Sequence, residues 1–330
     1  MSEPQVVVAT HGHCFDGLCS AVMFTRLMRH LRRGEPGSVQ FRYHSCGYGP
    51  GQNGVDPKLL VGDENAILDF RFSAAPELTW YFDHHVSAFP SDGDRAAYEA
   101  RVGDGGSPER RFFHDGTYSS CTKLIADLGA AKFDLDPTPT VELVKWADMI
   151  DSAAFPNAKM AVERREPELQ LMTVIENMAD DAFLSRFVPR LLVEELADVA
   201  RAPDVAAMYE PLGRGHDAFV QLVRERAVEK HGVVVVDLSD RIIDVAGKFV
   251  TYALYPDSAY SILLSRSKTK CKISIGYNPW SPVARTHNIA AICERHGGGG
   301  HPVVGAISLA ADAVEQAKAL TESIAVELGT

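Results

Sequence analysis

The sequence predicts an α/β protein, with a doubly wound, mostly parallel sheet followed by a smaller C-terminal α/β domain. Short apolar runs alternate with helical segments in the first half of the chain, as is typical of a doubly wound sheet. A second set of apolar runs begins at Val233, after a mainly helical region. The length of 330 residues also favours two domains over one. We therefore expect a first domain over 1–200, a helical linker over 201–231 and a second domain over 232–330.

The first domain begins with a continuously apolar run at 6–9, which predicts a buried strand. Apolar residues then recur at helical spacing over 16–33, and further strands are expected at 39–45, 66–70 and 78–82. Residues 86–116 are rich in Gly, Asp, Ser and Arg and predict a long loop that could close as a flap. Helical patterns follow over 118–129, 140–153, 168–179 and 181–196.

The second domain is introduced by a helical pattern over 205–230 that breaks near 211–215. Its expected strands are 233–236, 249–254, 260–265 and 272–276. A helix over 287–295 precedes a run of four glycines, and an amphipathic helix over 311–328 closes the chain. The pattern predicts a second, smaller α/β domain.

The composition is that of a soluble globular protein, with 46% hydrophobic residues and a net charge of −11. No apolar run reaches the roughly 18 residues that would span a membrane. The N-terminus lacks the pattern of a signal peptide, and no CxxC pair suggests a zinc ribbon or a disulfide framework. We expect a cytoplasmic protein. The negative charge argues against binding of long duplex DNA but allows a small anionic substrate beside bound cations.

Metal-binding side chains follow three of the predicted strands. Asp83, His84 and His85 end one strand, Asp69 ends another, and His11 follows the first. The carboxyl ends of parallel strands meet at one edge of a sheet, where ligands bind. Such side chains are costly to bury and contribute little to packing, so they indicate divalent cations at this edge.

The turn after the first strand adds to this group. His11, His13 and Asp16 lie within six positions and can reach one or two cations. Gly17 and the start of the following helix lie where a phosphate could approach. The alternative is a polar turn in which Asp16 is the N-cap of the helix.

Two further motifs complete the set. Asp148 and Asp151 are three residues apart on a predicted helix and share one face. One of them could complete a metal site, and the sequence leaves open which. The segment from His296 to His301 contains four consecutive glycines, whose amides can form a cradle for an anion.

Together these motifs resemble the DHH phosphoesterase superfamily, which is named after the tripeptide found here as Asp83-His84-His85. The glycine motif resembles the DHH-associated substrate-binding domain, so the likeness spans most of the chain. The resemblance implies a phosphoesterase that uses two Mn²⁺ ions, with Mg²⁺ or Co²⁺ as substitutes. It also implies an active site in the cleft between the two domains.

The resemblance also implies roles for individual residues. His11 and Asp16 match the first motif, Asp69 the second and Asp148 the fourth. Asp69 is expected to bridge the two metals. His84 is expected to be a ligand.

In the same way, Asp83 is expected to support His84 or to bind metal directly, and His85 to contact the phosphate. The far end of the substrate is expected to contact the residues of the glycine motif, Gly298, Gly299, Gly300 and His301.

The sequence departs from the superfamily pattern in two places. The first motif usually holds two aspartates spaced two apart, and here the earlier one is Cys14. His13, or a Cys14 thiolate, would then replace a carboxylate and favour a softer metal. The superfamily also carries an Arg after a Ser in the strand before the glycine motif. That residue is absent here, and Arg266 on the preceding strand is expected to replace it.

We therefore expect metal-dependent hydrolysis of a short oligonucleotide or a small nucleotide phosphodiester by a two-metal mechanism. One alternative is a phosphomonoesterase or an exopolyphosphatase-type hydrolase. A second is a protein that has lost catalysis and senses nucleotides, and a third is an RNA-handling module. The sequence leaves the natural substrate and the oligomeric state open, and a homodimer is compatible with it.

Overall fold

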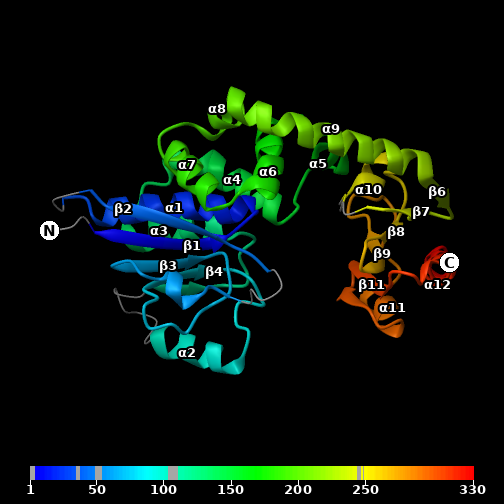
Figure 1. Cartoon of the computed structure of the whole chain (residues 1–330), viewed down its shortest axis with the longest axis horizontal. Helices are drawn as coiled ribbons and strands as arrows, with labels where there is room; N and C mark the ends of the chain where they lie inside the picture. The colour runs from blue at the N-terminus through cyan, green and yellow to red at the C-terminus, as the bar shows by residue number, and fades with distance from the viewer. Residues whose placement is uncertain (1–3, 35–37, 49–53, 103–110, 244–246, 248) are drawn as a thin grey trace. The chain divides into compact units, whose positions relative to one another are not determined.

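The computed structural model describes residues 4–34, 38–48, 54–102, 111–243, 247 and 249–330. The chain divides into two compact units. Figure 1 shows the chain coloured from blue at the N-terminus to red at the C-terminus. The first unit comprises Met1–Ala154 and Glu166–Tyr209, and the second comprises Phe155–Arg165 and Glu210–Thr330. The domain boundaries expected from the sequence, at residues 200 and 231, remain predictions.

The first unit is built on a five-stranded sheet in the order β2-β1-β3-β4-β5, in which every neighbouring pair is parallel. This confirms the predicted α/β class with a parallel sheet. The apolar strands of the centre are fully buried, as Val6, Val7 and Val8 show. The bounds of the strands are β1 Gln5–His11, β2 Gln40–Cys46, β3 Glu64–Leu68, β4 Trp80–Asp83 and β5 Phe112–His114.

Helices cover both faces of this sheet. On one face, Phe24 of α1 (Phe15–Leu31) packs against Trp80 and Phe82 of β4. On the other face, Tyr98 of α2 (Asp92–Val102) packs against Tyr81. Because successive residues of a strand point to opposite faces, the two helices lie on opposite sides of the sheet, as a doubly wound fold requires.

Further helices complete the first unit. Their bounds are α3 Cys121–Phe133, α4 Val141–Asp151, α6 Pro167–Met178, α7 Asp181–Leu191 and α8 Leu196–Ala200. The long helix α9, Pro203–Arg226, spans the division between the two units. Among the described residues, no helix has both the length and the apolar character needed to cross a membrane.

Three predictions for these regions are wrong. The predicted loop over 86–116 contains α2 and β5, although residues 103–110 lie outside the described part of the chain. The helix expected over 181–196 ends at Leu191, and α8 follows as a separate helix. The predicted break near Pro211 is absent, since α9 continues through it. Residues 209–211 are half-buried or exposed, so water can reach this stretch of backbone and lower the cost of the hydrogen bond that proline removes.

The second unit contains a six-stranded sheet in the order β10-β11-β9-β8-β7-β6. Only the pair β7 and β8 is parallel. The bounds are β6 Ala227–Lys230, β7 Val233–Ile242, β8 Tyr260–Arg266, β9 Lys270–Tyr277, β10 Gly299–His301 and β11 Val304–Ala310. The predicted second α/β domain is confirmed in its class.

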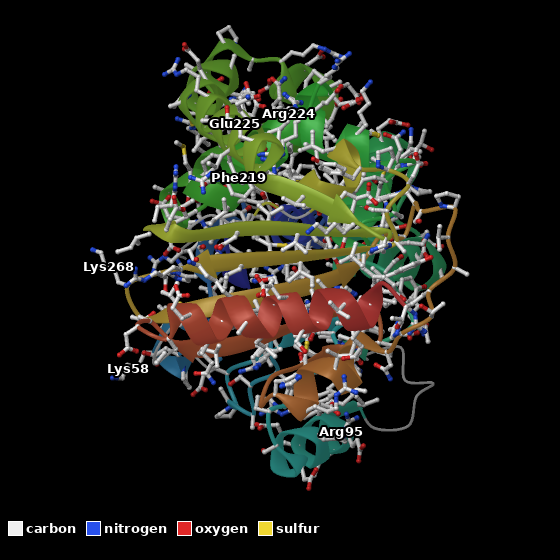
Figure 2. All side chains as sticks on the ribbon, turned by 90° about the vertical axis from the view of Figure 1, so that its right-hand side faces the viewer. Lys58, Arg95, Phe219, Arg224, Glu225 and Lys268 are labelled. Atoms are coloured by element: carbon white, nitrogen blue, oxygen red, sulfur yellow. The ribbon has the colours of Figure 1, made fainter. Side chains whose placement is uncertain are left out.

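Helix α12 (Val314–Leu328) lies across β7, β8 and β9, where Ile324 and Leu328 join a core with Ile262 and Ile273. Figure 2 looks onto this helix and also labels Phe219, which α9 contributes to a second core. The remaining helices are α5 Ala158–Glu163, α10 Val250–Leu254 and α11 Ile289–Arg295.

The strand predicted over 249–254 is wrong, because this segment forms α10. Its run of aromatic and β-branched residues is typical of a strand. However, Phe249 adopts a φ of 71° and turns the chain into a helix that buries Val250 and Tyr252. Tertiary burial therefore decides against the local propensity.

Candidate metal centre

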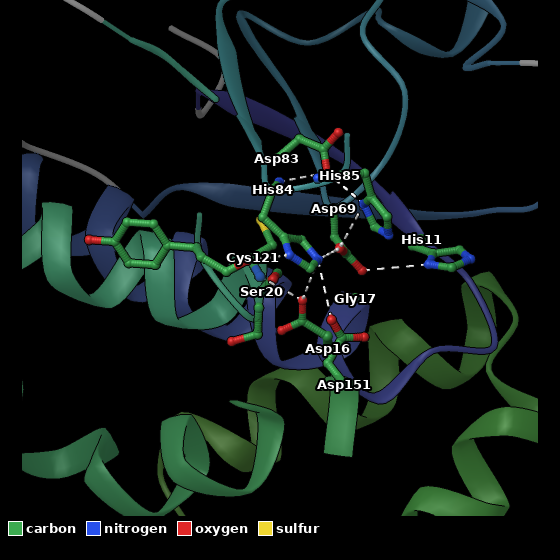
Figure 3. A network of polar contacts seen from close by, with 12 residues as sticks. His11, Asp16, Gly17, Ser20, Asp69, Asp83, His84, His85, Cys121 and Asp151 are labelled. Atoms are coloured by element: carbon green, nitrogen blue, oxygen red, sulfur yellow. Dashed lines mark hydrogen bonds and ion pairs between the residues drawn. The ribbon is translucent and has the colours of Figure 1, made fainter. Parts of the chain in front are cut away.

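The carboxyl ends of three neighbouring strands form the centre of the candidate site. β1 ends at His11, β3 is followed by Asp69, and β4 ends at Asp83, ahead of His84 and His85. The chain first adds β2 on one side of β1 and then β3 on the other, so the strand order reverses between β1 and β3. Ligand sites in doubly wound sheets lie at such a switch point. Figure 3 shows the side chains converging there.

Asp16 enters this cluster from the first turn of α1. Its carboxylate accepts hydrogen bonds from the backbone amides of Cys121 and Thr122 at 2.7 and 3.0 Å, at the start of α3. Gly17 permits this geometry, because a Cβ there would lie 2.0 Å from the carbonyl oxygen of His11. Burial, followed by the charges of Asp69 and Asp151, raises the pKa of Asp16 well above its ordinary value. Another positive charge is needed to keep these carboxylates ionised together.

Asp69 is the centre of the cluster. It is fully buried, and neither of its carboxylate oxygens has a hydrogen-bond partner among the described residues. Its oxygens lie 3.5 Å from His11 Nδ1, 3.5 Å from His84 Nε2 and 3.6 Å from His85 Nδ1. Its φ of 53° is a left-handed conformation, which costs free energy and is concentrated at functional sites.

Burial opposes ionisation of Asp69, but the nearby imidazoles of His11 and His84 lower its pKa to about 2. The carboxylate is therefore charged, buried and without a hydrogen bond. Such a group is costly in a folded protein unless a cation binds it.

His84 has a defined orientation. Its Nδ1 lies 3.0 Å from the carbonyl oxygen of Tyr118, which can only accept, so Nδ1 carries the proton. Its Nε2 then faces three carboxylates, at 3.3 Å from Asp151, 3.5 Å from Asp69 and 3.9 Å from Asp16. A carbonyl that fixes one ring nitrogen while the other points at carboxylates is typical of a metal-bound histidine.

Burial lowers the pKa of His84, but the carboxylates of Asp151 and Asp69, at 3.3 and 3.5 Å from Nε2, outweigh it and raise the pKa to about 11. Without a metal, Nε2 therefore holds a proton. The nitrogen that holds this proton and the carboxylates around it are also suitable metal ligands. A divalent cation can therefore bind there in place of the proton.

The described residues contain three overlapping groups that could hold a cation. Asp69 belongs to two of them and His84 to two. The groups are His11, Cys14 and Asp69; Asp69, His84 and His85; and Asp16, His84 and Asp151. The unpartnered atoms of His11, Asp69 and His84 agree with this reading, since each is buried and points into the cluster. The donor set therefore fits divalent cations.

Asp83 holds His85 in place. Its Oδ1 accepts from the ring Nδ1 of His85 at 2.8 Å and from the backbone amides of His84 and His85 at 2.9 and 3.2 Å. Its Oδ2 accepts from the hydroxyl of Tyr81 at 3.0 Å. The hydrogen bond that His85 donates to Asp83 raises the pKa of His85 above its ordinary value. Nε2 of His85 remains available for a ligand.

The structure brings together most of the predicted metal ligands, but not all. His13 is exposed, with a φ of 53°, and belongs to none of the groups found among the described residues. Cys14 takes part in its place. Asp148 accepts hydrogen bonds from Ser119 and Ser120 at 2.5 and 3.2 Å and is likewise outside the groups, whereas Asp151 is inside.

Apart from His85, the predicted substrate-binding residues lie in the second unit. Gly299, Gly300 and His301 form the exposed strand β10, which pairs with β11. Gly298 is required there, because a Cβ would lie 2.3 Å from the carbonyl oxygen of Ala306. The conformation of the glycine segment thus depends on the close approach of its backbone to that of β11.

The structure does not bring Arg266 to the glycine segment. Arg266 pairs with Cys271 at one end of β8, and its Nε donates to the carbonyl of Ala311. Through β11 and β9, Gly299 and His301 lie level with Leu263 and Ser261 of β8, which are three and five residues from Arg266. Two strands, β11 and β9, also lie between the glycine strand β10 and β8, and neighbouring strands are about 4.8 Å apart. The prediction that they bind one phosphate together does not fit this arrangement.

Two further arginines were not singled out in the sequence. Arg71 lies over the ring of Tyr48 at 4.9 Å, its Nε has no partner in the described chain, and Tyr48 contacts the ring of His11. Arg285 donates to the carbonyl of Pro302, beside His301. The spacing gave no signal for either, since both lie outside the recognised motifs.

No family model matches the sequence, and no curated protein matches it. Several solved structures share its fold. A pGpG-specific phosphodiesterase of Vibrio cholerae, PggH, is 19% identical with a TM-score of 0.66, and 98% of this chain covers 99% of that one. The DHH domain of a member of a ribosomal protein family is 10% identical with a TM-score of 0.55, over 99% of this chain and 87% of that one.

The exonuclease RecJ of Thermus thermophilus in complex with Mn²⁺ is 11% identical, with a TM-score of 0.52. Here 98% of this chain covers 52% of RecJ. These similarities confirm that the chain has the fold of DHH-domain proteins, as its motifs predicted.

Proposed function

We propose that this chain is a divalent-cation-dependent phosphoesterase that hydrolyses short oligonucleotides or small nucleotide phosphodiesters. The observation that carries the proposal is the buried, unpartnered carboxylate of Asp69, which lies between His11 and His84. Packing gives no reason for this arrangement, whereas cation binding does. The fold shared with a phosphodiesterase and an exonuclease supports the same reaction class.

Two cation positions are compatible with the geometry, and Mn²⁺ is the ion that we propose to test first. His11, Cys14 and Asp69 would hold one ion, and Asp16, His84 and Asp151 the other, with Oδ1 of Asp69 3.5 Å from Nε2 of His84. Asp69 would then contact both, through different oxygens. Bound divalent cations lower the pKa of water and neutralise charge that develops on a phosphate.

His85 is the residue placed to act on the substrate itself. Asp83 accepts the Nδ1 proton, and the raised pKa favours the imidazolium, so Nε2 can donate a proton. Hydrolysis of a phosphodiester adds water to phosphorus and leaves an alkoxide that needs a proton. We propose that His85 supplies it or stabilises the charge on the phosphate oxygens.

Arg71 is a candidate for a contact with a phosphate, because its Nε is buried without a partner and its ring neighbour Tyr48 touches His11. Arg71 therefore takes the role that the sequence assigned to Arg266. The other predicted substrate-binding residues of the second unit stay in the proposal: Gly298, Gly299, Gly300 and His301.

The proposal is tested by measuring the Mn²⁺-dependent release of mononucleotide from pGpG and from other dinucleotides. A generic phosphodiester is assayed in the same way through the alcohol that it releases. Turnover that disappears on chelation and returns with Mn²⁺ supports it. Tight nucleotide binding without turnover of any phosphate ester would indicate a sensor instead. Binding of tRNA without phosphate release would indicate an RNA-handling module.

A further inference from the structure

Cys14 occupies an unusual place at the start of α1. It is the N-cap residue of the helix, a position at which Ser, Thr, Asp and Asn are preferred because their oxygens bind free amides. The side chain of Cys14 makes no such capping hydrogen bond. Helix capping therefore does not account for a cysteine here.

The Cys14 sulfur lies instead with two metal-binding atoms. Sγ of Cys14, a ring nitrogen of His11 and a carboxylate oxygen of Asp69 are all within 4.8 Å of one another. Asp69 is fully buried, and within the described part of the chain neither of its oxygens nor the buried Nδ1 of His11 has a hydrogen-bond partner. These two residues, independently of the cysteine, indicate a ligand at this point.

The two cation positions differ in their donor atoms. The position formed by Asp16, His84 and Asp151, with Asp69 3.5 Å from His84, offers only oxygen and nitrogen, which suit Mn²⁺ and Mg²⁺. The position formed by His11, Cys14 and Asp69 adds sulfur, which favours Zn²⁺, Co²⁺ or Fe²⁺.

We infer that Cys14 is a direct thiolate ligand and makes the position beside His11 selective for a borderline-soft cation, so that the centre is asymmetric. Binding transfers the thiol proton to solvent and forms a bond between the cation and Sγ. The inference rests on the cation binding in the proposed function, but it does not require catalysis.

Co²⁺ provides a direct test, because a cobalt–thiolate bond gives an intense near-ultraviolet charge-transfer absorption that oxygen and nitrogen ligands do not give. The full-length apo protein is titrated with Co²⁺ and its absorption recorded. The wild-type chain should show the band. Cys14→Ser and Cys14→Asp should lose it, while the amount of bound Co²⁺ is measured separately by elemental analysis.

Two control variants match these changes. His13→Ala removes the neighbouring exposed imidazole, and Cys121→Ser changes a buried thiol whose Sγ donates to the carbonyl of Phe82 at 3.3 Å. Both should keep the band. A wild-type protein with two bound Co²⁺ and no band, or a band that survives Cys14→Ser, would overturn the inference.

A measurement on the wild type alone covers the case in which Cys14 variants fail to fold. X-ray absorption of the Zn²⁺-loaded chain should show a sulfur neighbour at about 2.3 Å. An ion surrounded only by oxygen and nitrogen would contradict the thiolate.

Metal selectivity gives an independent measurement. Loss of a direct ligand should weaken Zn²⁺ binding at least as much as loss of an outer partner does, roughly 10-fold to 100-fold. Cys14→Asp should therefore lower the ratio of Zn²⁺ to Mn²⁺ affinity by about that factor, and an unchanged ratio would contradict the inference.

The inference and the proposed function fail in different ways. A cobalt–thiolate band without turnover of any phosphate ester would refute the hydrolase and leave the thiolate ligand. Turnover of a phosphate ester with no sulfur bound to either ion would support the hydrolase and refute the thiolate ligand.

Discussion

The metal centre of the first unit and the glycine segment of the second were both singled out by their sequence, yet they are organised in opposite ways. In the metal centre, Asp69 and Asp83 are fully buried, and Asp69 has unpartnered oxygens within the described chain. In the glycine segment, Gly299, Gly300 and His301 are exposed, and backbone pairing with β11 explains their conformation.

This contrast shows which evidence carries function. A buried carboxylate whose oxygens make no hydrogen bond within the described chain, and whose nearest charged groups are imidazoles at 3.5–3.6 Å, is costly, so a bound cation is the expected compensation. An exposed hairpin of glycines is stable by itself, and its role depends on the resemblance alone. Variants should therefore affect the metal centre more strongly than the glycine segment.

Asp69→Asn should have the largest effect. The amide keeps the shape and tolerates the left-handed backbone, but it removes the charge that both cation positions share. Cations contribute several kcal/mol to such reactions, so kcat/KM should fall by about 10³-fold or more. Thermal unfolding of the apo form should change little, because the variant removes both the cost of burying a charge and the ion pairs of that charge with His11 and His84. Activity close to that of the wild type would contradict the assignment.

Asp83→Asn should reduce kcat by roughly 10²-fold to 10⁴-fold, since it acts through His85. The hydrogen bond that His85 donates to Asp83 raises the pKa of His85, so the variant lowers this pKa. Activity that needs protonated His85 should then be lost at a lower pH than in the wild type. The pH profile of kcat measures this shift, and an unchanged alkaline limb would show that His85 is not the group that titrates.

Asp151→Asn and Asp148→Asn form a matched pair on α4. Asp151 faces His84, whereas Asp148 is held by Ser119 and Ser120. Titration calorimetry with Mn²⁺ should show a loss of affinity of roughly 10-fold to 100-fold for Asp151→Asn and a smaller loss for Asp148→Asn. The reverse order would assign the ligand to Asp148.

His301→Ala should have a smaller effect, confined to substrate binding. A hydrogen bond to a charged group contributes about 1.5–3 kcal/mol, so KM should rise by roughly 10-fold to 100-fold while Mn²⁺ affinity stays unchanged. Steady-state kinetics with a dinucleotide measures both parameters. An unchanged KM would remove the glycine segment from the site.

Per pH unit, the smallest expected effect is the pH dependence of apo stability. The pKa of His84 is raised to about 11 in the folded state, so its contribution is fully present below its unfolded pKa of about 6.5. It is lost as the pH rises from there towards the folded pKa, by at most about 1.4 kcal/mol per unit. Chemical denaturation between these limits should show a steeper loss in the wild type than in His84→Gln. Equal slopes would contradict the shift.

The sequence predicted the parts of the site that depend on sheet geometry. His11, Asp69 and His84 follow parallel strands, and the ends of parallel strands must meet. The choice between Asp148 and Asp151 was not accessible, because residues three apart share a helix face and only tertiary contacts with Ser119 separate them.

The choice between His13 and Cys14 depends on backbone direction in the same way. His13 adopts a left-handed conformation and turns outwards, while Cys14 is extended and remains beside His11. Adjacent residues in a turn have no fixed periodicity, so the pattern of side chains does not predict this outcome. Similarly, α10 was missed because burial, rather than local propensity, decides its conformation.

The most direct test is the number of Mn²⁺ ions bound by the apo chain and by Asp69→Asn, measured by calorimetry and elemental analysis. We predict two ions for the wild type and a loss of high-affinity binding in the variant, with both proteins folded. Saturating Mn²⁺ that leaves the wild type without bound ions, or binding that Asp69→Asn leaves unchanged, would contradict a metal centre at this edge of the sheet.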